Sequence, residues 1–228
     1  MAARYPMLFL VMLMACSAPS RAAANPSPPS RQWTTPVWWA DNGQNDGVLW
    51  GAEVDGAFSD RAGWSASYLY GSFNQGGDIE RHGEWTALAR WRFAGWRFGA
   101  GWSYHQIDTD LERGFSWSYP EEEQERNADI HGPLLTAGAE IPLSASGLIA
   151  RVELGALPHD FGELNDLDRN GRYAEALVEL AWQAARWRAA AGYRYRLYDD
   201  VPPRVINDEV FDRDDMHGVI VSLAFLLP

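Results

Sequence analysis

The chain repeats one arrangement five times: a polar loop leads into a glycine, and a run of alternating apolar and polar residues follows. The five starts read Asp46-Gly47-Val48-Leu49-Trp50, His82-Gly83-Glu84-Trp85, His131-Gly132-Pro133-Leu134-Leu135, Asn170-Gly171-Arg172-Tyr173-Ala174 and His217-Gly218-Val219-Ile220-Val221. In the first four repeats a very short turn and a second alternating run come next. A unit of about 36 to 49 residues, made of strand, short turn, strand and long polar loop, is typical of a meandering β-barrel.

Alternation with period two gives each run one apolar and one polar face. In the run after His82-Gly83, for example, Trp85, Ala87 and Trp91 lie on one face and Arg90 on the other. Nine runs are clear, and residues 32–39 supply a tenth in which Pro36 would sit at a bulge or a weak edge. Bacterial barrels favour even strand numbers, so we predict an all-β, antiparallel, up-and-down barrel of about ten strands, with eight as the alternative.

Large aromatic residues gather at the two ends of the predicted strands, and alanines fill the middle. One set flanks the short turns (Trp64, Trp91, Phe93, Trp96, Trp182, Trp187), and the other lies toward the long loops (Trp50, Tyr70, Trp85, Trp102, Tyr104, Tyr193, Tyr195). Indole and phenol rings prefer lipid headgroups, so two such belts predict a transmembrane barrel rather than a soluble sandwich or a lipocalin-like barrel. We expect periplasmic turns, extracellular loops, and Ala139 on the lipid face near the middle of the membrane.

The amino terminus has the features of an export signal. Arg4 precedes an apolar run, residues 7–15, that is too short to span a membrane. We predict a signal peptide over residues 1–24, cleaved after an Ala-Ala-Ala site. Alternatively, Leu13-Met14-Ala15-Cys16 resembles a lipobox, and a lipoprotein signal would end before a lipidated Cys16. A Pro/Ser-rich tether (residues 25–31) and the barrel (residues 32–228) follow. Cys16 is the only cysteine, so no disulfide is expected in the barrel.

In architecture the chain resembles the small outer-membrane β-barrel proteins of Gram-negative bacteria over residues 32–228, although it carries no signature motif. The resemblance implies an outer-membrane location, contact with outer-membrane lipid and lipopolysaccharide, insertion by the barrel-insertion machinery, and a monomer. Such barrels end on an aromatic residue, whereas this chain ends Phe225-Leu226-Leu227-Pro228, so Phe225 would take that role. The formal charge of −12 argues against a nucleic-acid partner, whose phosphates would be repelled.

The polar face carries opposite charges at matched positions across the short turns. Glu140 is expected opposite Arg151, and Glu175 opposite Arg194. We therefore predict a plugged, ion-paired interior and a structural or surface-interaction role without enzymatic chemistry. A narrow passive pore is an alternative.

One further matched pair suggests chemistry. Glu84 is expected opposite His105 near the outer rim, with Asp108 and Asp110 a few residues on. A carboxylate can orient a histidine as a general base, and omptin proteases use Asp and His at the top of a ten-stranded barrel. A rim-site hydrolase of this kind is the second alternative, with Glu84, His105 and Asp108 as its candidate catalytic residues.

No metal or cofactor is expected. Asp166, Asp168 and Asn170 match the first half of a calcium loop, but Leu177 stands where the bidentate glutamate belongs. His82, His131 and His217 belong to different strands and are interpreted as polar turn residues. The third long loop holds Phe115, Trp117 and Tyr119 before an acidic run, as either an adhesive surface or a lid over the barrel mouth.

Overall fold

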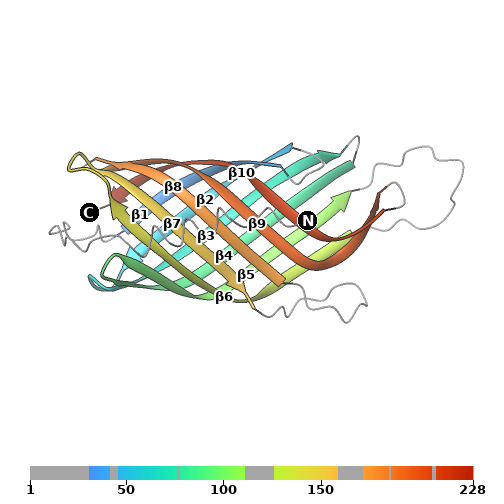
Figure 1. Cartoon of the computed structure of the whole chain (residues 1–228), viewed down its shortest axis with the longest axis horizontal. Helices are drawn as coiled ribbons and strands as arrows, with labels where there is room; N and C mark the ends of the chain where they lie inside the picture. The colour runs from blue at the N-terminus through green and yellow to red at the C-terminus, as the bar shows by residue number, and fades with distance from the viewer. Residues whose placement is uncertain are drawn as a thin grey trace, which may run out of the picture.

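The computed structural model describes residues 31–41, 46–75, 78–110, 126–158, 172–184, 186–206 and 209–227. Within these ranges the chain forms ten antiparallel strands that close into a barrel, each paired with its neighbours in sequence and β1 with β10 (Figure 1). No helix in this part of the chain is long and apolar enough to cross a membrane. The prediction of an all-β, ten-stranded antiparallel barrel is confirmed. The strands are β1 (Arg31–Asp41), β2 (Asp46–Ala57), β3 (Ala62–Gln75), β4 (Asp78–Phe93), β5 (Trp96–Asp110), β6 (Arg126–Pro142), β7 (Leu148–Leu157), β8 (Arg172–Gln183), β9 (Trp187–Ile206) and β10 (Glu209–Leu227).

Short turns join the strands at one end of the barrel, on the left in Figure 1. The tightest connects β4 to β5 through Ala94 (φ 50°) and Gly95 (φ 86°). Positive φ at both central residues is the pattern of a type I′ turn, whose twist matches that of the flanking strands. Glycine adopts this conformation freely, whereas Ala94 pays a steric cost because of its Cβ. The tight turn thereby fixes the register Phe93↔Trp96 between the two strands.

At the opposite end, parts of the expected loops are paired strand instead. β3 and β4 stay paired up to Gln75↔Asp78, and β9 and β10 up to Ile206↔Glu209, with one register irregularity between Phe211 and Arg213. The β9–β10 hairpin consequently extends past its neighbours (Figure 1). The first strand begins at Arg31, one residue before the expected start of the barrel.

Pro36 lies inside β1 and not at an edge, because β1 pairs with β10 as well as with β2. It is paired with Ser222 of β10 in an unbroken ladder, whereas the β1–β2 ladder has no paired positions at Thr35 and Pro36. Since proline has no N–H to donate, it interrupts one ladder locally. The expectation of a bulge or weak edge is wrong, because the second neighbour holds the strand in register.

The predicted faces are confirmed by side-chain exposure. Along β4, Trp85, Ala87 and Ala89 are exposed, while Glu84, Thr86 and Leu88 are buried inside the barrel. Ala139 keeps the outward parity of β6, but it is paired with Trp96 beside the β4–β5 turn and only 7% exposed. Its expected place in the middle of the outer surface is therefore wrong. Ala89, midway between Trp85 and Phe93, occupies that place.

An apolar layer fills the interior toward the long-loop end. Its residues are inward-facing and buried, and they sit in the loop-side part of their strands: Trp38, Leu49, Phe73, Ile130, Leu157, Tyr173, Tyr198 and Met216. Toward the turns the inward positions become charged. The expectation of an ion-paired interior thus describes the part of the lumen below this apolar layer.

Candidate functional site

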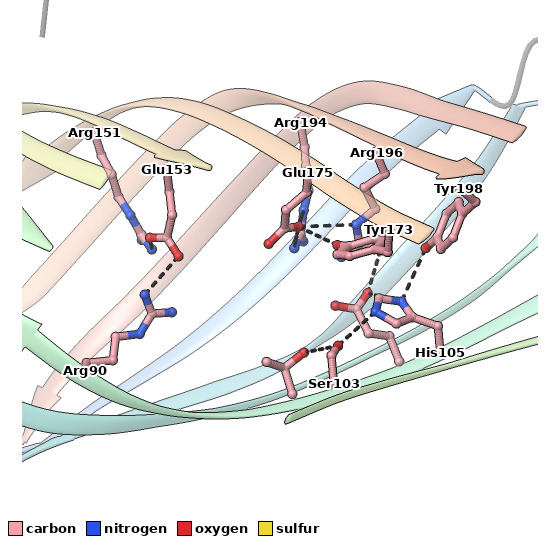
Figure 2. Close-up of polar contacts among 12 residues, drawn as sticks. Arg90, Ser103, His105, Arg151, Glu153, Tyr173, Glu175, Arg194, Arg196 and Tyr198 are labelled. Atoms are coloured by element: carbon pink, nitrogen blue, oxygen red, sulfur yellow. Dashed lines mark hydrogen bonds and ion pairs between the residues drawn. The ribbon is translucent and has the colours of Figure 1, made fainter. Parts of the chain in front are cut away.

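Charged side chains from six strands, β4 to β9, converge inside the barrel in two groups, which Figure 2 shows separated along its length. The turn-side cluster consists of Arg90, Arg97, Glu140, Arg151, Glu153, Glu179 and Arg188. The central cluster, beneath the apolar layer, consists of Glu84, His105, Glu175, Arg194 and Arg196. The chain contains no lysine, so every cation here is an arginine, whose planar, weakly hydrated fork suits buried ion pairs.

The turn-side cluster is a chain of shared ion pairs. Glu153 accepts from Arg90 Nη1 at 2.9 Å and from Arg151 Nη2 at 2.5 Å. Arg151 Nη1 continues the chain to Glu179 Oε2 at 3.4 Å. Beside it, Glu140 accepts from Arg97 and lies 3.6 Å from Arg188 Nη1. Each carboxylate therefore meets an arginine from a different strand, which ties the strands together across the lumen.

Arg196 organises the central cluster and is 1% exposed. Its Nη1 lies 2.5 Å from Glu84 Oε2 and its Nε 3.5 Å from Glu175 Oε2, while Arg194 Nη2 reaches Glu175 at 2.7 Å. The guanidinium carbon of Arg196 also lies 4.8 Å from the centre of the Trp38 ring, a cation–π contact. Tyr173 donates to Glu175 at 2.7 Å. The apolar layer and the central cluster are thus one continuous packed plug.

The predicted charge pairs are correct in part. Glu140 is opposite Arg151 in the β6–β7 register, as expected, yet the two side chains point to other partners. Glu175 is opposite Arg196, not Arg194, because the β8–β9 register differs by two residues from the expected one. Glu175 nonetheless bonds Arg194, since a two-residue offset keeps both side chains on the inner face.

The candidate catalytic pair is opposed as expected, but it does not lie at a wet rim. Glu84 and His105 are 6% and 2% exposed, beneath the apolar layer. Glu84 Oε2 is 3.9 Å from His105 Nδ1 and much closer to Arg196. Asp108 is three residues from His105, so it faces outward, where Gln106 Nε2 donates to it at 3.1 Å. The three candidate residues therefore do not form one site.

Ser103, which lies beside His105, is a residue that the sequence did not single out as a candidate. Ser103 Oγ lies 2.8 Å from His105 Nε2, and Tyr198 OH lies 3.3 Å from His105 Nδ1. A serine beside a histidine is the geometry of a nucleophile and its base. The i, i+2 spacing of Ser103 and His105 puts both side chains on the same face of a strand, and this spacing is the sequence signal that could have identified the pair. Ser103, however, is 0% exposed and also bonds Thr86 Oγ1 at 3.0 Å, so no substrate reaches it in this arrangement.

A cavity of about 90 Å³ lies between the two charged clusters. Its lining includes Glu84 and Arg194 from the central cluster and Arg151 and Arg188 from the turn-side cluster. A space of this size holds only a few water molecules. This cavity is therefore smaller than the pockets that hold organic ligands.

The remaining candidate residues are dispersed or lie outside the described part of the chain. His82 faces inward and bonds Glu80, whereas His131 and His217 face outward on β6 and β10. No group of three or more potential metal ligands is found among the described residues. The calcium candidates Asp166, Asp168 and Asn170, the lipidation candidate Cys16 and the aromatic loop residues Phe115, Trp117 and Tyr119 fall outside the described ranges.

No protein-family model matches the chain, and no curated protein sequence matches it. Similar solved structures include the translocator domain of autotransporter NalP from Neisseria meningitidis, at 10% identity, covering 96% of this chain and 95% of that one, with a TM-score of 0.39. The beta domain of the Bordetella autotransporter Brka is 13% identical, covering 88% of this chain and 100% of its own, with a TM-score of 0.34. The anion-selective porin from Comamonas acidovorans is 10% identical, covering 84% of this chain and 58% of its own, also with a TM-score of 0.34. The functions of these proteins do not transfer to this chain at such similarity.

The buried contact of Arg196 with Glu84 predicts that replacing Arg196 lowers the stability of the barrel. Arg196→Met should lower the free energy of unfolding by about 3–5 kcal/mol, because it leaves Glu84 buried without its cation. Glu84→Gln/Arg196→Met should recover part of that loss. Urea unfolding in lipid vesicles, followed by tryptophan fluorescence, measures both. Arg186→Met, at an exposed turn position, is the control and should change stability by less than about 0.5 kcal/mol. An equal loss in Arg186→Met and Arg196→Met would contradict the assigned role of Arg196.

Proposed function

We propose that this protein is an integral outer-membrane β-barrel with a closed lumen, acting through its surface at the long-loop end. The outer surface supports the membrane placement. Over the middle of the described strands, outward positions carry no charged residue, and exposed side chains there include Leu135 and Val178. Trp96 and Tyr104, the aromatic ends of β5, lie eight positions apart in the strand. At about 3.3 Å per residue and a tilt near 40°, they span roughly 20–25 Å, close to the apolar band of such barrels.

The packing of side chains in the lumen is the observation that carries the proposal. The apolar layer blocks the long-loop end, and the two charged clusters fill the space below it. In the clusters arginines and glutamates neutralise one another, so the interior presents no uniform charge that would draw ions through. A plugged, ion-paired barrel is favoured over a narrow pore for this reason.

Of the described carboxylates, Asp41, Asp46, Asp108, Asp129 and Asp215 lie at the long-loop end of the barrel. The whole chain carries a net charge of −12. At the turn end, Arg31, Arg61, Arg92 and Arg186 are exposed. A strongly acidic end steers association with cationic or hydrogen-bonding partners and repels anionic ones. We therefore propose the long-loop end as the surface that meets a partner.

We infer that the protein carries out no enzymatic chemistry. Ser103 and His105 are the sole described pair with nucleophile-and-base geometry, and both are sealed beneath the apolar layer. A fluorophosphonate ester should accordingly fail to label the folded protein, as read by intact-mass spectrometry. Labelling that disappears in Ser103→Ala while the barrel still folds would show a reactive serine and overturn this inference.

Conductance tests the closed lumen directly. In a planar lipid bilayer the wild-type protein should give no sustained open-channel current. Glu84→Ala/Arg196→Ala removes two opposite charges and much side-chain volume from the plug, so it should produce current steps. Arg186→Ala, outside the lumen, is the control and should stay silent. Sustained wild-type steps would show that the lumen is a pore.

The lipid-facing surface is tested by a charge placed at two heights. Ala89→Arg should block insertion or cost about 2–4 kcal/mol, because it lies midway between the aromatic ends of β4. Ala156→Arg carries the same change at an exposed position near the loop-side end of β7, where the cost should be at most about 1 kcal/mol. Urea unfolding in vesicles and the gel mobility of unheated samples measure the difference. Equal costs would mean that this surface does not face lipid.

A further inference from the structure

Two hairpins carry the same three-residue arrangement on the outside of the barrel near the long loops. On β5–β6, Tyr104 is paired with His131 and donates to Asp129 at 2.9 Å. On β9–β10, Tyr195 is paired with His217 and its hydroxyl lies 3.5 Å from Asp215. In both hairpins the tyrosine and histidine rings stack, with interplanar angles of 26° and 9°. The repetition places aromatic rings beside paired hydrogen-bonding groups at the same level of the outer surface.

His217 of the second arrangement lines a hollow of about 490 Å³ on the outer surface. The hollow spans four strands, from β9 and β10 across the barrel's closure to β1 and β2. Trp39 and Tyr193 stand at its sides and are about half exposed, and Val48 and Val219 add apolar surface. Asp41 and Asp46, which face each other across the β1–β2 hairpin, lie at its loop-side edge together with His217.

The chemistry of this lining selects the ligand class. No arginine belongs to the described residues that line the hollow, and its carboxylates repel phosphate and carboxylate groups. An ammonium group is a donor only, whereas the hollow also presents the Tyr193 hydroxyl bonded to His217 Nδ1 at 2.9 Å, a pair that can both donate and accept. Hydroxyls have this double character, and the flat apolar faces of sugar rings stack on exposed aromatic rings.

We propose that this hollow binds the sugar headgroup of a glycolipid at the outer surface of the membrane. Asp41 and Asp46 accept from sugar hydroxyls, Trp39 and Tyr193 flank the ring, and the hydrocarbon chain runs toward the membrane over Val48 and Val219. The proposal rests on the membrane placement proposed above, since that placement sets the aromatic belt at the level of the headgroups.

Three probes with the same eight-carbon chain separate the headgroup chemistries. The protein is inserted in phosphatidylcholine nanodiscs, which contain no sugar, and octyl glucoside, octyltrimethylammonium and octyl phosphate are added below their micelle concentrations. Saturation-transfer NMR should show transfer from the protein to the ring protons of the glucoside, and little to the N-methyl protons of the ammonium probe or to the O–CH2 protons of octyl phosphate. Equal or stronger transfer to the ammonium probe would make the hollow a cation site and overturn the proposal.

Variants of residues that line the hollow test whether the glucoside binds there. Asp41→Asn/Asp46→Asn and Trp39→Leu should each weaken glucoside binding about tenfold or more, the usual cost of losing charged hydrogen bonds or an aromatic anchor. Trp50→Leu, an exposed tryptophan on the same outer surface but outside the hollow, and Asp60→Asn at the turn end should bind as the wild type does. Unchanged binding in the Asp41/Asp46 variant would overturn the proposal. Failure of the wild type to insert, seen by gel mobility, would instead refute the membrane placement, and the wild-type probe comparison stands even if a variant misfolds.

Discussion

The pairing of β1 with β10 is the interaction on which the rest of the structure depends. It runs without a break from Arg31↔Leu227 to Asp41↔His217 and leaves no open sheet edge between these strands. An unpaired edge would be prohibitively costly in lipid, so the proposed membrane placement requires the sheet to close. Gly218 allows the close approach, since a Cβ there would lie 1.8 Å from the Trp39 carbonyl oxygen.

Closure turns one face of the sheet into a confined interior and so determines what its side chains can do. Charged residues that would be solvated on an open sheet are forced together across the lumen, where an unpaired charge is expensive. Arginine and glutamate therefore alternate as neighbours, and Arg196 in addition packs on the ring of Trp38. The same confinement buries Ser103 and His105, whose geometry alone would suit a hydrolase. The burial of Ser103 and His105, and not their residue types, supports a structural role for this pair.

The outer face of the barrel has the opposite distribution of charge from the interior. Over the middle of the described strands its outward positions carry no charged residue, and tyrosine, histidine and aspartate side chains gather where the strands approach the long loops. Tyr104 with His131 and Tyr195 with His217 occupy that boundary, where rings and hydrogen-bonding groups are both stable. The closure of the barrel also creates the outer hollow, because its lining comes from the first two and the last two strands. A site of this kind has no counterpart in any single hairpin.

Local sequence was sufficient for the strands, their number, their two faces and the hairpin partners, because the period of two and the tight turns act over short distances. Glu84 opposite His105 and Glu140 opposite Arg151 follow from counting outward from a turn. The actual contacts of these residues required the closed barrel. Arg90 reaches Glu153 and His105 reaches Tyr198 across the lumen, between strands that are not neighbours in the sheet. The β1 strand accommodates Pro36 because it also pairs with β10, which is distant in sequence. The apolar layer above the charged clusters is likewise built from strands that are distant in sequence. The curvature of the barrel and the stagger of its strands determine which inward side chains come into contact. Neither can be predicted by counting residues outward from a turn.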